Sequence, residues 1–150
     1  MEKANRRIIR QKPGRGGKME SYLLFIMVGV ILIIVMASPY FNWQAKSLVV
    51  IYYAIVTFLF IGITRRINTK YEGVIPVPDA YWDENSAWAY TASNLLLIPF
   101  IGILIFIYYK WFANSKTLWA KILIALSMIP AAFLVFIFYF FFNFGYGYRP

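Results

Sequence analysis

The fold is decided by SYLLFIMVGVILIIVMAS at residues 21–38 and SLVVIYYAIVTFLFIGIT at residues 47–64, two stretches of eighteen residues without a charge. A helix of about 20 mostly apolar residues is long enough to cross the hydrocarbon core of a membrane. Only eight residues, Pro39–Lys46, separate the two stretches, and Pro39 ends the first helix. These features predict two antiparallel membrane spans joined by a short turn.

The second half of the chain predicts two further spans. Residues 85–109 carry no charge, but only the part from Leu95 onward is strongly apolar, so we place a span at 89–109. The uncharged run that begins at Ile122 is longer than one crossing requires, so the span at 120–143 either tilts or lets its aromatic end leave the bilayer core. The predicted fold class is therefore an all-α integral membrane protein: a four-transmembrane-helix bundle of two hairpins, residues 21–150, behind a basic tail, residues 1–20.

Composition excludes several classes of protein. Of the 150 residues, 61% are hydrophobic and 14% are charged, whereas a soluble domain has about 45–50% apolar and about 25% charged residues. Cysteine and histidine are both absent, which removes thiol chemistry, imidazole bases and the commonest ligands of zinc and haem iron. The sequence predicts no cofactor, no metal site and no catalytic residue.

The charges predict an orientation with both termini in the cytoplasm. With four spans, eleven basic residues lie on the side of the N-terminus and four on the other side, as the positive-inside rule requires. All five tryptophans fall in connections or at span ends, where interfacial aromatic belts place them. A signal peptide is the competing interpretation, but the tail is long for one and a second apolar run follows at once.

The basic tail at residues 1–20 is expected to be mobile, because Pro13-Gly14 and Gly16-Gly17 break helices and like charges repel. It serves to hold the N-terminus inside, contacts anionic lipid headgroups, or binds nucleic acid. Nucleic acid is disfavoured as a partner because the tail lacks aromatic residues for base stacking. The candidate lipid contacts are Arg6, Arg7, Arg10, Lys12, Arg15 and Lys18.

Residues 65–88 are predicted to form a cytoplasmic loop that lies along the membrane surface. Pro76 and Pro78 alternate with valines, which favours an extended backbone. A helix would gather the carboxylates on one side, as a hard cation requires, but a solvated acidic loop is the simpler interpretation. The candidate interfacial residues are Asp79, Trp82, Asp83, Glu84 and Trp88.

The fourth span carries features of a packing surface. Ser127 and Ala131 are small residues one turn apart, which lets two helices approach closely, either inside the bundle or between subunits. Phe136 and Phe140 belong to a phenylalanine-rich face, residues 133–144. This face is wider than the contact surface that packing among four helices requires, so part of it is expected to meet lipid or a partner. Pro99 and Pro130 are expected to kink their helices unless neighbouring groups compensate.

No motif in the sequence identifies an activity. Apart from Lys121 at the start of the span 120–143, no predicted span contains a charged side chain, which disfavours a proton-coupled carrier. The leading hypothesis is a small accessory or structural subunit, without catalysis of its own, that associates with other membrane proteins or with itself in a bacterial plasma membrane. The alternative is an oligomeric channel or transporter for ions or small solutes.

Overall fold

The computed structural model describes the backbone of residues 16–147 and the side chains of residues 22–147. Within this range the protein is all-helical and has no strand. The four helices are α1 (Gly16–Ala37), α2 (Trp43–Lys70), α3 (Asp79–Asn114) and α4 (Leu118–Gly147). Of these, α2, α3 and α4 are long and apolar enough to cross a membrane, and Tyr22–Ala37 of α1 is a shorter apolar helix.

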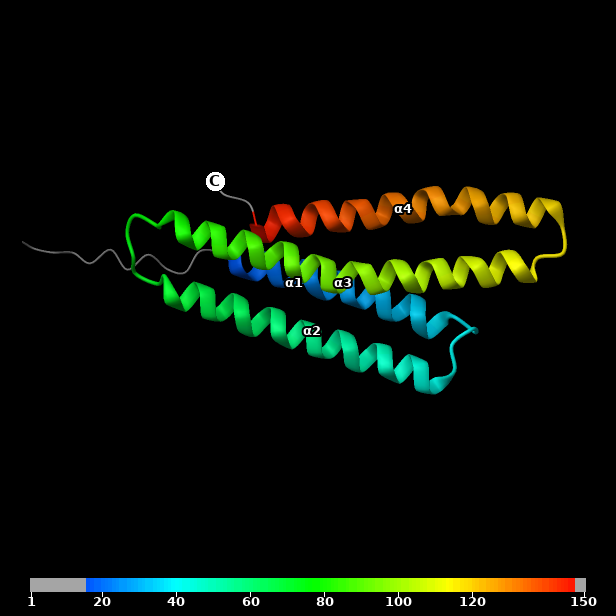
Figure 1. The fold of residues 1–150 in the computed structure, drawn as a ribbon, viewed down its shortest axis with the longest axis horizontal. Coiled ribbons are helices and arrows are strands. Elements are labelled where there is room, and N and C mark those ends of the chain that lie inside the picture. Colours follow the sequence, from blue (N-terminus) through cyan, green and yellow to red (C-terminus); the bar gives the residue numbers. More distant parts are fainter. Residues whose placement is uncertain (1–15, 148–150) are drawn as a thin grey trace, which may run out of the picture.

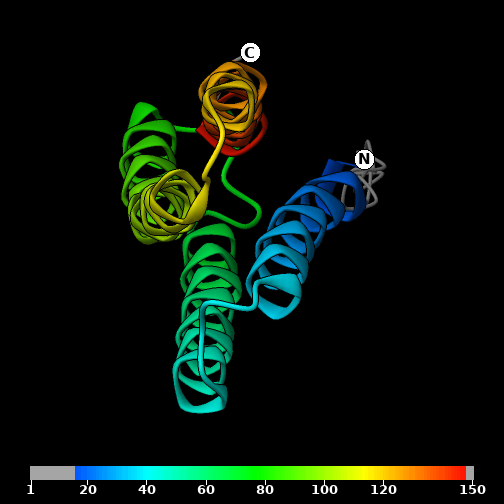
Figure 2. The same cartoon turned by 90° about the vertical axis from the view of Figure 1, so that its right-hand side faces the viewer.

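The helices run in alternating directions along one long axis (Figure 1). The connections 38–42 and 115–117 lie at one end of the molecule, and the connection 71–78 lies at the other, together with the beginning of α1 and the end of α4. Viewed along the helices, α3 lies between α2 and α4, and α1 lies beside α2 (Figure 2). This arrangement contains the two expected hairpins, α1–α2 and α3–α4.

The first hairpin turn is held by hydrogen bonds that compensate helix ends. The Asn42 side chain caps α2 by accepting from the Ala45 amide at 2.8 Å. The Lys46 ammonium donates to the Met36 carbonyl at 2.7 Å, so a basic group of α2 satisfies one of the last carbonyls of α1. The turn therefore ties the two helices together.

The predicted loop over residues 65–88 is helical at both ends, and the expectation of an extended backbone from its prolines onward was wrong. Helix α2 continues through Arg65 and Arg66 to Lys70, and α3 begins at Asp79, so only residues 71–78 are non-helical. Pro78 occupies the N-cap of α3, where the missing amide hydrogen costs nothing because the first helical amides have no partner within the helix. The prolines thus end the connection and permit a helix directly after them.

The helix break expected at Gly16-Gly17 is also absent, and α4 extends beyond the predicted span end at residue 143. Gly16 and Gly17 form the first turn of α1, and the Gly-Tyr segment up to Gly147 continues α4. A glycine costs only about 1 kcal/mol relative to alanine in a helix, which the contacts of a long helix can offset. The remaining tail residues, 1–15, lie outside the described range.

The core lies where the four helices meet, toward the end of the molecule that carries the connection 71–78. The buried side chains of α1, α2 and α3 recur every three or four residues, as one face of a helix requires. Helix α4 contributes only Phe142 and Tyr146, from its last turns. The core comprises Leu24, Met27, Ile31, Tyr53, Val56, Phe60, Ala89, Ala92, Leu96, Leu97, Phe100, Phe142 and Tyr146.

Pro99 and Pro130 both lie inside helices, and a tyrosine of a neighbouring helix supplies the donor that Pro99 lacks. Pro99 has no amide hydrogen to give to the Leu95 carbonyl, four residues earlier in α3. The Tyr52 hydroxyl of α2 donates to that carbonyl at 2.8 Å, and the Tyr53 hydroxyl donates to the next one, Leu96, at 2.9 Å. The expected compensation for the missing amide hydrogen of Pro99 thus comes from a tyrosine of α2.

Pro130 shows a related arrangement in α4. Its ring disturbs the preceding turn, and the Tyr108 hydroxyl of α3 donates to the Ser127 carbonyl, three residues before the proline, at 3.0 Å. Each proline-containing helix is thus bonded, at its weakened turn, to the helix that precedes it in the chain. The carbonyl that Pro130 deprives of its donor is that of Leu126, so the Tyr108 bond lies beside it, whereas the Tyr52 bond directly replaces a lost donor. An unpaired carbonyl in hydrocarbon costs several kcal/mol, so the Tyr52 bond couples the position of Pro99 to helix pairing.

We predict that Tyr52→Phe destabilises the protein by about 1 kcal/mol, because the Leu95 carbonyl loses its donor. In a Pro99→Ala background the same substitution is expected to cost much less, because the amide that this change introduces at position 99 serves that carbonyl. Thermal unfolding of the four combinations in mild detergent measures this coupling. An equal cost of Tyr52→Phe in both backgrounds would contradict the pairing of Tyr52 with the proline.

Candidate functional site

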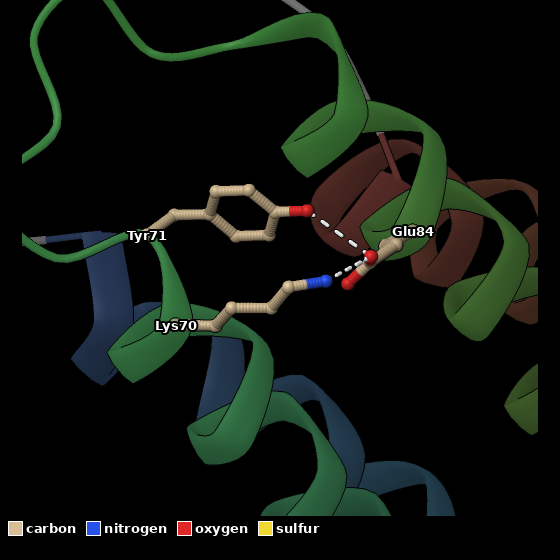
Figure 3. A network of polar contacts seen from close by, with 3 residues as sticks. All are labelled: Lys70, Tyr71 and Glu84. Carbon is tan, nitrogen blue, oxygen red and sulfur yellow. Dashed lines mark hydrogen bonds and ion pairs between the residues drawn. The ribbon is translucent and has the colours of Figure 1, made fainter.

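A cluster of polar and aromatic side chains surrounds the connection 71–78, and we call it the polar junction: Asn68, Lys70, Tyr71, Tyr81, Glu84, Asn85 and Ser86. Lys70 ends α2 and Glu84 lies in the second turn of α3. The Lys70 ammonium forms an ion pair with Glu84 Oε1, and the Tyr71 hydroxyl donates to the same oxygen at 3.0 Å (Figure 3). One carboxylate therefore joins α2 to α3.

The electrostatics of this contact follow from its hydrogen bonds. Lys70 and Glu84 lie outside the predicted spans 47–64 and 89–109 and are open to solvent. The hydrogen bond from Lys70 lowers the pKa of the Glu84 carboxyl, and the Tyr71 hydroxyl acts in the same direction. The Glu84 carboxylate in turn raises the pKa of the Lys70 ammonium. Solvent screening keeps the contribution of such an exposed pair to stability small.

Tyrosine rings extend the polar junction. The Tyr81 hydroxyl donates to Asn68 Oδ1 at 3.1 Å, a second bond between α2 and α3. The Tyr81 ring meets Tyr71 edge-on, with centroids 5.5 Å apart, and meets Trp82 in the same way at 5.0 Å. Edge-to-face pairs at these distances are favourable contacts. The polar junction is therefore a hydrogen-bonded contact between α2 and α3 rather than an open loop.

The expected interfacial residues all lie in the first turns of α3. Asp79 and Asp83 are exposed and one turn apart, whereas Glu84 reaches α2. Trp88 stacks on Phe60, with centroids 6.2 Å apart, and its indole donates to the Thr64 hydroxyl at 3.3 Å. In the part of the chain that the structure describes, no three carboxylates come together as a metal-binding group.

The end of α4 is fastened to the same junction. Asn85 Nδ2 donates to the Tyr146 carbonyl, and Ser86 Oγ donates to the Gly147 carbonyl at 2.7 Å. These are carbonyls of the last turn, which have no partner within the helix. A Cβ at Gly147 would lie 3.3 Å from Ala89 Cβ, so glycine allows this close approach. The bonds explain why α4 continues through a Gly-Tyr segment.

Two serines inside the apolar segments make hydrogen bonds that hold helices together or satisfy their own helix. Ser93 is buried on α3 and exchanges hydrogen bonds with Asn143 of α4, at 3.2 and 3.3 Å. Ser127 donates to the Ile124 carbonyl at 2.8 Å and lies 3.4 Å from the Tyr108 hydroxyl. Ser127 and Ala131 are partly buried, and Ser127 meets α3. Ser127 thus takes part in packing inside the bundle.

Phe136 and Phe140 face outward instead, and with Phe144 they form a row that we call the phenylalanine ladder. Their exposed fractions are 62%, 52% and 51%. The rings of Phe136 and Phe140 stack with centroids 6.5 Å apart, and those of Phe140 and Phe144 at 5.9 Å with planes 11° apart. No residue in the most apolar eighteen-residue stretch of α4 is buried against the rest of the described chain. The ladder is therefore an ordered aromatic surface that faces away from the bundle.

The candidate lipid contacts lie beyond what the structure describes. Arg6, Arg7, Arg10, Lys12 and Arg15 precede the described range, and Lys18 lies in α1 within the segment whose side chains are not described. Sequence reasoning missed the roles of Tyr52, Tyr53 and Tyr108. A tyrosine at mid-span is a signal for such a role, but its partner proline lies on another helix, and only helix pairing identifies it.

Comparison with known proteins returned no relative: no family model matches the chain, and no match was found among curated proteins or solved structures. The polar junction and the phenylalanine ladder are therefore interpreted from their own chemistry. The polar groups of the junction have hydrogen-bond partners within the chain, whereas the rings of the phenylalanine ladder are exposed on the outer face of α4.

We predict a pH dependence that is specific to Glu84. Since its pKa is lowered on folding, its stabilising effect is present at neutral pH and is lost as the pH falls through the lowered value. At alkaline pH the pair is lost again as Lys70, whose pKa is raised, gives up its proton. Glu84→Gln is expected to flatten the change in unfolding midpoint between neutral and acidic pH.

The matched control is Glu72→Gln, which removes an exposed carboxylate from the neighbouring connection. The measurement is the thermal midpoint in detergent at pH 7 and at acidic pH for the native chain and both variants. If Glu72→Gln flattened the profile as much as Glu84→Gln, the specific role of the Lys70–Glu84 pair would be refuted.

Proposed function

We propose that the chain is a four-span protein of a cell membrane, namely a bacterial plasma membrane, with both termini in the cytoplasm. The support is the agreement between helix direction and charge. Arg65, Arg66 and Lys70 lie toward the end of the molecule where α1 begins and α4 ends, and Lys46, Lys110, Lys116 and Lys121 lie toward the opposite end. With the tail and Arg149 this is the eleven-to-four asymmetry that the positive-inside rule favours.

This orientation predicts that reporters fused after Pro150 and inserted in the connection 71–78 are both cytoplasmic, whereas one inserted at 115–117 is external. Paired alkaline phosphatase and fluorescent-protein fusions measure the side directly. An external C-terminus would reduce the number of spans and overturn the proposal.

We further propose that the protein is a non-catalytic accessory or structural subunit that binds another membrane protein, or a second copy of itself, through α4. The phenylalanine ladder is the observation that carries this proposal. Lipid chains are satisfied by any apolar surface, so a row of mutually stacked rings is more specific than solvation by lipid requires. Aromatic pairs contribute about 0.5–1.5 kcal/mol beyond their buried area, and aromatic residues are enriched where partners bind most strongly.

The polar contacts support a packing role over a conducting one. Ser93 is bonded to Asn143, and Ser127 to the main chain of its own helix, so these side chains serve contacts within and between helices. A pore lined by so few polar groups would be poorly selective. The channel or transporter alternative would require other groups, supplied by an assembly of several copies.

The test is to purify the full chain from its native membrane in mild detergent and identify what accompanies it by native mass spectrometry. Phe136→Leu/Phe140→Leu keeps the surface apolar but removes two rings of the ladder. We expect it to weaken the association with the partner, or with a second copy, about tenfold, which corresponds to about 1.4 kcal/mol.

The matched control is Phe25→Leu/Phe58→Leu, which replaces two exposed phenylalanines of α1 and α2 and is expected to leave the association unchanged. A chain that is strictly monomeric and copurifies with nothing would refute the accessory-subunit proposal. Flux of ions or small solutes through proteoliposomes containing only this chain would favour the channel alternative instead.

A further inference from the structure

The two hairpins have apolar segments of unequal length. The uncharged run of α2, between Lys46 and Arg65, has 18 residues. The span 89–109 of α3 has 21 residues, and the uncharged part of α4, residues 122–147, has 26. At 1.5 Å per residue these helical segments measure about 27 Å, about 32 Å and about 39 Å. The hydrocarbon core of a typical bilayer is about 30 Å thick. The α1–α2 hairpin suits a bilayer slightly thinner than this, and the α3–α4 hairpin suits a thicker one.

The hairpins are level at one end of the molecule only. At the polar junction, Lys70 pairs with Glu84, and Ser86 bonds to Gly147, so α2, α3 and α4 are fastened side by side. The difference in length therefore accumulates toward the other end. The connection 115–117 projects beyond the connection 38–42 along the long axis (Figure 1).

A ring contact locates this step along α3. Phe41, in the first hairpin turn, packs against Phe106 of α3, with ring centroids 5.2 Å apart. Helix α3 continues for eight residues beyond Phe106, to Asn114, which is a projection of about 12 Å. Tilting the whole molecule as a rigid body cannot remove the step. A tilt that brought the two hairpin tips level would move the helix ends at the polar junction out of level.

The projecting part carries membrane-facing chemistry. Its exposed side chains are mostly apolar, whereas a segment projecting into water would be polar. Lys110 lies over the Phe106 ring at 5.5 Å and Lys121 over the Phe112 ring at 5.2 Å, so both basic side chains lie along the aromatic surface of this part. The exposed apolar side chains in and beside the projection include Ile105, Tyr109, Trp111, Phe112, Leu118 and Trp119.

Each hairpin tip has its own interfacial markers. Trp43 and Lys46 mark the tip of the short hairpin, and Trp119 and Lys121 mark that of the long one. The two sets lie at different heights. We infer that the protein holds a step in the thickness of its lipid shell, with long-chain phospholipids against the α3–α4 overhang and a thinner bilayer against α1–α2. Mismatch of this kind sorts lipids and proteins by thickness.

This inference rests on the proposed four-span insertion, and the chain is well suited to a direct test because it has no cysteine. Trp43→Cys and Trp119→Cys replace side chains that are 72% and 77% exposed, so a label at either site reports its surroundings rather than burial in the protein. Each full-length variant is labelled with an environment-sensitive fluorophore. It is then reconstituted into phosphatidylcholine vesicles with monounsaturated chains of about 14, 18 or 22 carbons, which bracket the typical hydrocarbon thickness.

We expect the label at position 43 to be shielded from an aqueous quencher already in the vesicles with the shortest chains, and the label at position 119 only in those with the longest chains. Shielding of both labels at the same chain length would overturn the inference while leaving four-span insertion intact. Shielding of position 119 at every chain length would assign the overhang to contact with a second copy, and would also overturn the inference. If neither label were shielded in any vesicle, the membrane assignment itself would fail.

Discussion

Inside hydrocarbon no water is present to accept or donate hydrogen bonds, and this constraint governs how the helices pair. A proline within a helix leaves a carbonyl without its donor, at a cost of several kcal/mol if nothing replaces it. Here the Leu95 carbonyl, which Pro99 deprives of its donor, accepts from the Tyr52 hydroxyl of α2. The Tyr108 hydroxyl of α3 donates to the Ser127 carbonyl of α4, in the turn that precedes Pro130. Helix α2 is thereby bonded to α3, and α3 to α4, at a defined height along each helix.

The other polar contacts work at the ends of the bundle. Lys70, Tyr71 and Glu84 join α2 to α3, while Asn85 and Ser86 hold the last carbonyls of α4. Because these bonds level the helices at the polar junction, unequal helix lengths appear entirely at the opposite end. The close approach at Gly147 and the buried Ser93–Asn143 pair keep α4 against α3 over its last turns, and the remainder of α4 is left to face outward.

The outward face has two regions with different chemistry. The phenylalanine ladder lies near the level end, is ordered by its own ring stacking, and suits a protein partner. The overhang near Trp119 lies at the stepped end, mixes aliphatic and aromatic side chains with lysines, and suits lipid. In the proposed role as an accessory subunit, the first region binds a membrane protein or a second copy, and the second region shapes the surrounding bilayer.

The sequence by itself determined the class of protein and much of its fold. Long uncharged runs divided by basic residues and prolines predicted four helices and both hairpin turns, because burying charge in hydrocarbon is costly and chain turns must be short. The sequence-based prediction misplaced two helix ends. The start of α3 was missed because a proline permits a helix directly after it. The end of α4 was missed because side chains distant in the sequence bond to the last carbonyls of a glycine-containing turn. Only the tertiary structure decided which main-chain carbonyl each tyrosine serves, that Ser127 faces α3 while Phe136 and Phe140 face outward, and that the hairpins are level at one end. These contacts depend on how one helix is rotated and shifted along its axis relative to another. The hydrophobic periodicity of a single helix does not encode that placement when nearly every position is apolar.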